Sequence, residues 1–280
     1  MFWEYIKALI YGVIEGITEW LPVSSTGHLI LLEGFFDFDI GGSAELSAEF
    51  CSMLDVVVQL GAILAVLCIY ARPLLPTKQN KKSALSLWRS LVLCTIPAAL
   101  IGLIADTLCQ KLLGTELDSL LFEPRIVASA LIIYGILFIL IEKLTAEGYK
   151  DVTHKHALAI GFFQALAIVP GTSRSGATIL GARVLGIPRE KAARFSFYAA
   201  IPVISAASLL KICDFASFLK DTGEKLLPEA WIILLIASLT AFLTSLIAIK
   251  ALTGFVKKHT FIPFGIYRIL LGILVLLLIK

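Results

Sequence analysis

Long apolar runs without charged residues recur along most of this chain. They occupy residues 56–71, 90–105, 126–141, 195–210, 230–249 and 262–279, the last interrupted only by Arg268. Each run can be extended by flanking residues to the ~20 that a membrane-spanning helix requires. The pattern therefore predicts an all-α integral membrane protein with six transmembrane helices.

Two further segments, residues 2–32 and 157–185, are long enough to span a membrane, but a polar turn containing proline interrupts each one. The first turn reads Glu15-Gly-Ile-Thr-Glu19-Trp-Leu-Pro22-Val-Ser24-Ser25-Thr26-Gly27-His28. The second reads Gln164-Ala-Leu-Ala-Ile-Val-Pro170-Gly171-Thr-Ser173-Arg174-Ser175-Gly176-Ala-Thr178. Setting Gly12 against Gly161 without gaps aligns Glu15 with Gln164, Ser24 with Ser173, Ser25 with Arg174, Thr26 with Ser175 and Gly27 with Gly176.

Each interrupted segment is followed by three predicted spans, so the chain divides into two copies of one plan, about 1–145 and 146–280, within a single membrane domain 1–280. Three is odd, so the second copy enters the membrane from the opposite face. Such an inverted-topology repeat builds its site near the midplane from discontinuous helices. We expect two re-entrant helical hairpins whose tips meet, because irregular backbone at membrane depth must be covered by protein or a watery cavity. The alternative is that each segment is a kinked full span with a polar cap.

Composition and loop charge agree with a membrane location and give an orientation. Hydrophobic residues make up 58% of the chain and charged residues 16%, against ~25% in soluble domains. Residues 72–89 hold five basic and no acidic residues, whereas residues 33–50 hold five acidic and no basic ones. The positive-inside rule makes the first loop cytoplasmic and the second external. Alternation then puts loops 106–123 and 211–229 outside and loops 142–156 and 250–259 inside; solvation explains their charges.

The net charge of +3 is better explained by these topology signals than by a nucleic-acid partner, so we expect membrane lipids and no nucleic acid as partners. The sequence leaves the oligomeric state open, and an oligomer is compatible with it.

Glu15 and Glu19 are the first candidates for chemistry. They lie four residues apart, on one face of a helix, in an otherwise apolar stretch. A carboxylate at membrane depth costs ~2.5–3.5 kcal/mol on insertion scales, so a cation is expected nearby. The candidates are Arg174 and a divalent metal, since magnesium is commonly held by one or two carboxylates together with substrate phosphates. The structural alternative is that the pair only joins the hairpins through Arg174.

The two polar turns also suit an anionic ligand. Ser24-Ser25-Thr26-Gly27 and Ser173-Arg174-Ser175-Gly176 each precede an apolar run, where a helix N-cap belongs. Capping alone would explain one such turn. Two of them directed at one place predict a phosphate site, because helix N-termini present backbone N–H groups and a partial positive charge. Arg174 adds a planar fork matched to phosphate oxygens.

Ser25 and His28 are spaced for nucleophilic chemistry. The histidine lies three residues beyond the serine, close enough on a first helical turn for the two side chains to interact. A histidine can take the proton that a serine must lose to attack. The alternative is that His28 caps or packs. The chain has no G-x-x-x-x-G-K-[ST], G-x-S-x-G or H-E-x-x-H motif, which removes support for nucleotide-driven, esterase and zinc-protease functions.

Both motifs together resemble the undecaprenyl-diphosphate phosphatase family, also called bacitracin-resistance proteins. The resemblance rests on the stretch from Glu15 to His28 and on Pro170-Gly-Thr-Ser-Arg174-Ser-Gly-Ala-Thr178. It extends over essentially the whole chain, including residues 59–66 and 261–268. The two motifs are specific and occur in the right order, although the loops 33–50 and 106–123 have no match.

The resemblance implies a hydrolase of the bacterial plasma membrane that removes the terminal phosphate of undecaprenyl diphosphate at the outer face and recycles the carrier lipid of cell-wall synthesis. It implies a divalent cation, for which we expect magnesium or calcium. Glu15 and Glu19 would bind this metal or act in acid/base chemistry, and Ser25 and His28 would serve the attack. The diphosphate would be gripped by Arg174 with Ser24, Thr26, Gly27, Ser173, Ser175, Gly176 and Thr178.

Several alternatives stay open at this point. Direct attack by water, with Glu19 or His28 as the base, fits the sequence almost as well as attack by Ser25. Ser25-Thr-Gly-His28 is similar to a motif of the type 2 phosphatidic acid phosphatases, but no histidine follows Arg174 before His259, as that family would require. A transporter or flippase for a lipid phosphate is the non-enzymatic alternative, because inverted repeats with midplane sites are common in transporters.

Overall fold

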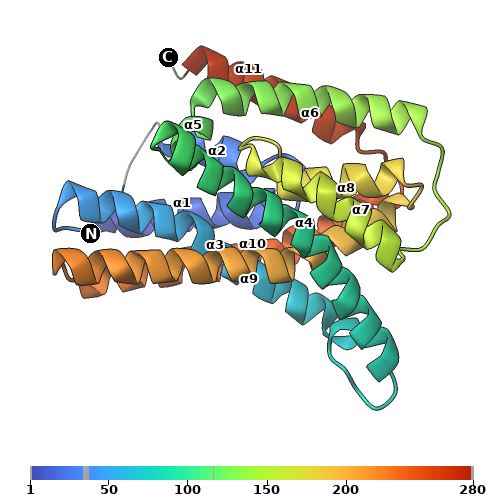
Figure 1. Cartoon of the computed structure of the whole chain (residues 1–280), viewed down its shortest axis with the longest axis horizontal. Coiled ribbons are helices and arrows are strands. Elements are labelled where there is room, and N and C mark those ends of the chain that lie inside the picture. The colour runs from blue at the N-terminus through green and yellow to red at the C-terminus, as the bar shows by residue number, and fades with distance from the viewer. Residues whose placement is uncertain (1, 34–37, 116, 279–280) are drawn as a thin grey trace.

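The computed structural model describes residues 2–33, 38–115 and 117–278, and the regular elements in these ranges are all helices (Figure 1). The α-helices are α1 (Phe2–Thr18), α2 (Ser25–Glu33), α3 (Ala44–Leu74), α4 (Lys81–Leu113), α5 (Leu117–Leu121), α6 (Pro124–Leu144), α7 (His154–Ala165), α8 (Arg174–Val184), α9 (Arg189–Thr222), α10 (Pro228–Val256) and α11 (Ile262–Leu278). One turn of 3-10 helix, η1 (Leu166–Ile168), follows α7.

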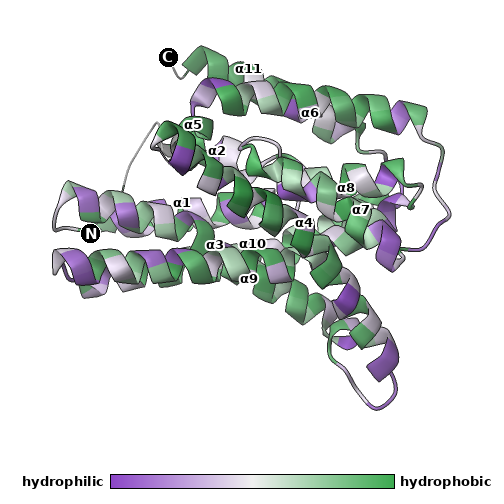
Figure 2. Ribbon diagram, viewed as in Figure 1, coloured by the Kyte–Doolittle hydropathy of each residue, from purple (hydrophilic) through white to green (hydrophobic). Residues whose placement is uncertain are grey.

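Five of these helices, α3, α4, α6, α9 and α10, are long and apolar enough to cross a membrane, and α11 is a shorter apolar helix. Figure 2 shows hydrophobic residues along most of the length of the helices, with many of the polar residues towards helix ends and connections. Many large apolar side chains are exposed, among them Ile247 and Leu277 at about 70%, as expected of surfaces that face lipid. The chain is therefore a multi-pass, all-helical membrane protein, as the apolar runs predict.

The long helices extend well beyond the apolar runs, so several predicted loops are largely helical. Helix α3 begins at Ala44, inside the predicted loop 33–50, and α9 continues to Thr222, through more than half of the predicted loop 211–229. Charged side chains can be solvated while the helical hydrogen bonds continue, so charge alone does not end a helix. Gly114 and Gly223, with φ of 71° and 72°, end α4 and α9 instead. Residues 34–37 of the first loop lie outside the described residues.

The two interrupted segments pack in equivalent ways against helices of the opposite half. Helix α1 packs along α10, and α7 packs along α4 (Figure 1). A Cβ added to Gly12 in α1 would lie 2.3 Å from the carbonyl oxygen of Ala237, and one added to Gly161 in α7 would lie 2.4 Å from that of Cys94. Each glycine therefore lets two helix backbones approach closely. These are the two glycines that the sequence alignment pairs.

Further pairs join the halves of the chain, among them α3 with both α9 and α10, and α6 with α11. The α6–α11 contact is reciprocal, since a Cβ on either Gly135 or Gly265 would lie 2.7 Å from the carbonyl oxygen of the other. The largest hydrophobic core among the described residues includes Trp20 of the turn after α1. This side chain is fully buried and meets Phe197 of α9 edge to face, with ring centroids 5.5 Å apart. The first polar turn is thus held inside protein.

Candidate active site

The turns of the two interrupted segments have the same unusual backbone geometry. Among the described residues other than glycine, Ser24 and Ser173 alone have positive φ, at 72° and 70°. This region disfavours L side chains, and the two serines occupy aligned positions in the sequence. Each precedes a helix and caps it, because Ser24 Oγ accepts from the amide of Gly27 at 3.4 Å and Ser173 Oγ accepts from that of Gly176 at 3.1 Å. The predicted N-caps are therefore confirmed.

The two turns, taken with the first residues of the helices that follow them, are in contact; we call them the first tip (residues 19–28) and the second tip (residues 169–178). Arg174, the first residue of α8, donates to Glu19 Oε1 through Nη2 at 2.9 Å and through Nε at 3.2 Å. Ser175 Oγ donates to the carbonyl oxygen of Leu21 at 3.4 Å. The predicted meeting of Glu19 with Arg174 is confirmed, across 155 residues of sequence.

Glu19 joins the cation to a hydroxyl group. Its second oxygen, Oε2, accepts from Ser25 Oγ at 3.2 Å, while Arg174 Nη1 donates to the carbonyl oxygen of Ser196 at 2.9 Å. The side chains of Arg174 and Glu19 are only 11% and 8% exposed. Partly buried charges in hydrogen-bonded contact interact strongly, so the guanidinium plane and the serine hydroxyl are both oriented by one carboxylate. The arrangement supplies a positioned hydroxyl, a potential proton acceptor and a cation at one place.

His28 has partners other than Ser25. Its Nδ1 lies 2.7 Å from the carbonyl oxygen of Ser24, and its Nε2 lies 2.7 Å from the hydroxyl of Tyr267. The rings of His28 and Tyr267 are stacked, with centroids 5.6 Å apart. A carbonyl only accepts, so Nδ1 carries a proton, and Nε2 of a neutral ring accepts from Tyr267. The spacing in sequence predicts contact between His28 and Ser25, but the serine donates to Glu19; the role of His28 as a base stays a prediction.

Glu15 has both carboxylate oxygens buried without a hydrogen-bond partner among the described residues, and its side chain is fully buried. The amide of Glu19 donates to the Glu15 carbonyl oxygen at 3.0 Å, so both side chains project from one face of the same helical turn. An unpartnered buried carboxylate is costly. The site therefore suits a cation or a proton at Glu15.

A divalent metal fits these carboxylates only if other ligands complete its shell. The described residues contain no group of three or more His, Cys, Asp or Glu side chains that could hold a metal ion. Magnesium, however, is often bound by one or two carboxylates together with substrate phosphate oxygens and water. The unpartnered oxygens of Glu15 fit that mode of binding.

The hydroxyl groups expected to grip a phosphate in the second tip already bond other protein groups. Thr178 Oγ1 donates to Ser196 Oγ at 2.7 Å and also contacts the carbonyl oxygens of Arg174 and Ser175. Ser173 and Ser175 share a hydrogen bond of 3.1 Å. Hydroxyls on a first helical turn readily bond nearby backbone and side-chain groups. In the structure these residues shape the tip, and their contact with a ligand stays a prediction.

Arg268 of α11 bonds both tips. It is fully buried; Nη2 donates to the carbonyl oxygens of Gly171 and Thr172 at 2.7 and 2.8 Å, and Nη1 donates to that of Pro22 at 3.3 Å. Its guanidinium carbon lies 5.9 Å from the ring of Phe138. The sequence contained a signal for this residue, because Arg268 is the one charge inside an apolar run, but its contact with the tips was not predicted.

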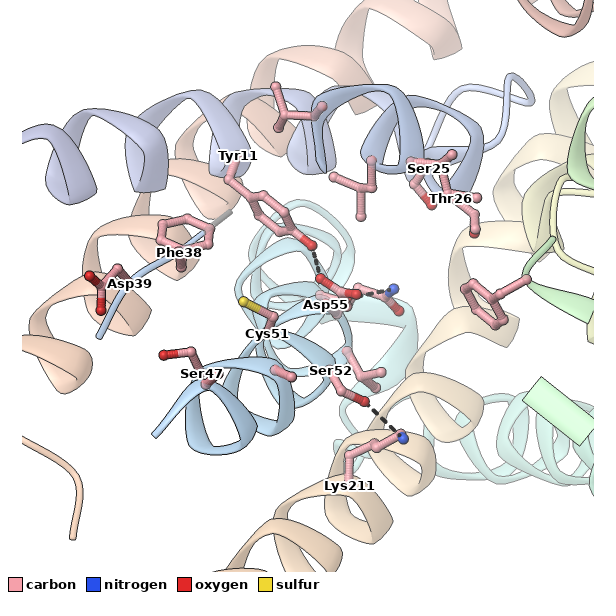
Figure 3. Close-up of a pocket in the computed structure, with 18 of the residues that line it drawn as sticks. Tyr11, Ser25, Thr26, Phe38, Asp39, Ser47, Cys51, Ser52, Asp55 and Lys211 are labelled. Carbon is pink, nitrogen blue, oxygen red and sulfur yellow. Dashed lines mark hydrogen bonds between the residues drawn. The ribbon is translucent and has the colours of Figure 1, made fainter. Parts of the chain in front are cut away.

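A cavity of about 1000 Å³ lies against the first tip (Figure 3). Ser25 and Thr26 line it, and so do residues from the three predicted external loops: seven residues between Phe38 and Ala48, Phe122 and Lys211. On its wall the hydroxyl of Tyr11 donates to Asp55, and Lys211 Nζ donates to Ser52 Oγ at 3.1 Å. Neither residue was predicted: Lys211 begins the predicted loop 211–229, where solvation explains its charge, and Asp55, directly before the apolar run 56–71, was given no role.

Comparison with known proteins gives matches along nearly the whole chain. A family model described as bacitracin resistance protein BacA matches residues 8–274. An undecaprenyl-diphosphatase of Acetivibrio thermocellus is 46% identical over 285 residues, covering 98% of this chain and 97% of the relative. Undecaprenyl-diphosphatases of Streptococcus mutans and Enterococcus faecalis are 46% and 45% identical, covering 99% and 97% of this chain and 96% of each relative.

Proposed function

The chain belongs to the bacitracin resistance protein BacA family, and from that premise we propose that it hydrolyses undecaprenyl diphosphate to undecaprenyl phosphate and inorganic phosphate. It is a membrane phosphatase, and the reaction recycles the lipid carrier of bacterial cell-wall synthesis. The observation that carries the site assignment is the contact of Arg174 and Ser25 with the two oxygens of Glu19. A cation and a hydroxyl are thereby held together at the start of two helices, where a phosphate is favoured.

The architecture that we propose is an inverted-topology repeat with six spans and two re-entrant hairpins, α1–α2 and α7–α8. Three observations support it: the shared φ of Ser24 and Ser173, the matched packing of α1 on α10 and α7 on α4, and the reciprocal contact of Gly135 with Gly265. A two-fold relation between the halves accounts for all three. The repeats, about 1–145 and 146–280, would form one membrane domain.

We place the protein in the bacterial plasma membrane with the site towards the outer face. The cavity supports this orientation, because residues from all three predicted external loops line it together with Ser25. The head group would reach the tips through this cavity, and the prenyl tail would remain among the apolar helices. The orientation itself rests on the positive-inside distribution of loop charges, which assigns those three loops to the outside.

In the proposed reaction Ser25 Oγ attacks the terminal phosphorus. The new Oγ–P bond forms while the bond from that phosphorus to the bridging oxygen breaks, and undecaprenyl phosphate leaves with the bridging oxygen. The serine proton passes to Glu19 Oε2, the acceptor to which it already donates. Water then attacks the phosphoserine, giving inorganic phosphate and restoring the serine hydroxyl. Arg174 stabilises charge on the transferring phosphoryl group, the main source of catalysis in such reactions.

Glu15 and Glu19 are the residues that would hold a divalent cation, magnesium or calcium, and phosphate oxygens of the substrate would complete its coordination shell. Such an ion would neutralise charge on the phosphate oxygens. His28, fixed by Ser24 and Tyr267, borders the nucleophile. In the competing mechanism water attacks directly, and Glu19 takes its proton. The contacts described above are the same in that mechanism, but Ser25 is not the nucleophile.

Phosphate release from undecaprenyl or farnesyl diphosphate by purified protein in detergent, with and without a chelator, tests the proposal. We expect Glu19→Gln and Arg174→Ala to lose about 100-fold or more of the rate, as for loss of a group that stabilises a transition state. Ser217→Ala is the control, because Ser217 is exposed on α9 and bonds only within its helix. Unchanged release by Arg174→Ala would remove the second tip from the site. Activity retained by Ser25→Ala would select the water mechanism.

A further inference from the structure

Lys211 is a cation on a long apolar helix, and it faces the cavity that Ser25 and Thr26 line. It lies in α9, one residue beyond the apolar run 195–210. Figure 3 shows its side chain crossing the space between α9 and α3, where Nζ donates to Ser52 Oγ at 3.1 Å. Ionisable residues in membrane helices are costly, usually face a polar cavity and often mark the path of a substrate or an ion.

The carboxylates on the cavity wall have other donors. Asp55 accepts from the hydroxyl of Tyr11, and Asp39 Oδ1 accepts from the amide of Gly41 at 3.0 Å. Among the ion pairs between described residues, none involves Lys211. The ammonium group therefore has the Ser52 hydroxyl as its direct hydrogen-bond partner, while the charge of Asp55 acts on it from beyond ion-pair distance. An ammonium group that faces a cavity without a carboxylate in direct contact can still bind an anionic ligand.

Phosphate is the anion that this cavity would meet. The cavity contains both Lys211 and Ser25, so a phosphate that approaches or leaves the proposed nucleophile passes through the space that the lysine faces. Ser47 and Ser52 add hydroxyls to the lining of the cavity, and lysine binds phosphate as a point charge. Resting on the proposed function, we propose that the Lys211 side of the cavity is a second phosphate-binding site, separate from Arg174. It would bind the terminal phosphate of the incoming lipid or the phosphate released from it.

Steady-state kinetics with three variants test this site. Lys211→Gln removes the charge, Lys211→Arg keeps it, and Lys220→Gln removes an equal charge from an exposed position on the same helix. If released phosphate binds there, the inhibition constant for inorganic phosphate rises about tenfold in Lys211→Gln, the effect of losing one charge-assisted hydrogen bond. If the lipid head group binds there, KM rises by a similar factor. We expect one or both changes, near wild-type values for Lys211→Arg, and none for Lys220→Gln.

A direct readout separates failure of this site from failure of the proposed function. The apparent unfolding temperature in detergent is measured with inorganic phosphate and with potassium chloride at equal ionic strength, which corrects for screening. We expect phosphate to stabilise wild type more than Lys211→Gln. Unchanged KM, inhibition constant and stabilisation in Lys211→Gln would overturn the second site while the hydrolysis stands. Stabilisation that depends on Lys211, in a wild-type protein that releases no phosphate, would support the site and refute the proposed function.

Discussion

Replacing Arg268 with lysine tests whether this buried side chain holds the two tips in place. The substitution keeps the charge, but lysine has no planar fork that could bond carbonyls in two directions. The native guanidinium donates to Gly171 and Thr172 in the second tip and to Pro22 in the first. We expect a single ammonium to serve one tip and leave the other without a donor.

The size of the effect follows from those bonds. Hydrogen bonds to a charged group contribute about 1.5–3 kcal/mol each, and the substitution loses one or two of the three. We therefore expect a loss of roughly 3 kcal/mol in stability, or about 6–12 °C in unfolding temperature by the scale of medium-sized domains. Misplacement of reacting groups by about 1 Å costs on the order of 100-fold in rate. We expect a fall of that order in phosphate release by folded protein.

Both quantities are measurable on the same preparation. Folded protein is isolated by size exclusion in detergent, its unfolding temperature is recorded, and phosphate release is measured per mole. Arg183→Lys is the matched control. Arg183 is equally buried and bonds Glu142 at 2.9 Å and the carbonyl oxygens of Ile187 and Ala146, but it contacts neither tip. We expect this control to lose stability and to keep its rate.

The two variants together can refute the reasoning. If Arg268→Lys is destabilised but releases phosphate as fast as wild type, the tips hold their geometry without the bridge. If Arg183→Lys loses activity to the same extent, reduced stability alone explains the Arg268 result. An Arg268→Lys protein with unchanged stability would mean that lysine satisfies both tips.

Two further outcomes are expected. Gly12→Ala and Gly161→Ala each place a Cβ within 2.4 Å of a carbonyl oxygen, so each should lower the free energy of unfolding by about 1–3 kcal/mol. The control Gly254→Ala, with open space around it, should be neutral or slightly stabilising. Equal unfolding temperatures for all three variants would contradict the close packing. Glu15→Gln removes a buried carboxylate that lacks a partner among the described residues. The unfolding temperature should therefore rise, by about 2–4 °C for each kcal/mol of burial cost that is removed, while phosphate release falls about 100-fold. Retained activity would exclude Glu15 from the site.

Much of the fold could be predicted from the sequence because membrane solvation imposes simple rules. Apolar runs of span length revealed the long helices, and loop charge gave an orientation. The polar turns were recognisable because Glu19 and Arg174 would be costly at membrane depth unless they met, and they do meet. The ungapped match of Ser24 with Ser173 identified positions with the same rare backbone conformation.

Other features depend on contacts across the chain that periodicity does not encode. Nothing in the local sequence indicates that Tyr267 bonds His28 over 239 residues or that Tyr11 bonds Asp55. Helix ends were misplaced because charged residues were assumed to end helices, whereas glycines in the left-handed conformation end two of them. Lys211 was assigned to solvent because a residue at the border of an apolar run can face either water or a cavity. Only the packing of α3 against α9 decides between these.

The turns that follow α1 and η1 share one backbone shape, yet the helices after them begin with different side chains, Ser25 and Arg174. A homodimer of half-length proteins would contain two identical turns, so its site would hold the same side chain twice. Two arginines would repel each other, and two serines would leave Glu19 without a counterion. With both turns in one polypeptide that constraint is absent, so each turn can carry its own side chain. We therefore expect that neither half, expressed alone and paired with itself, could assemble a working centre.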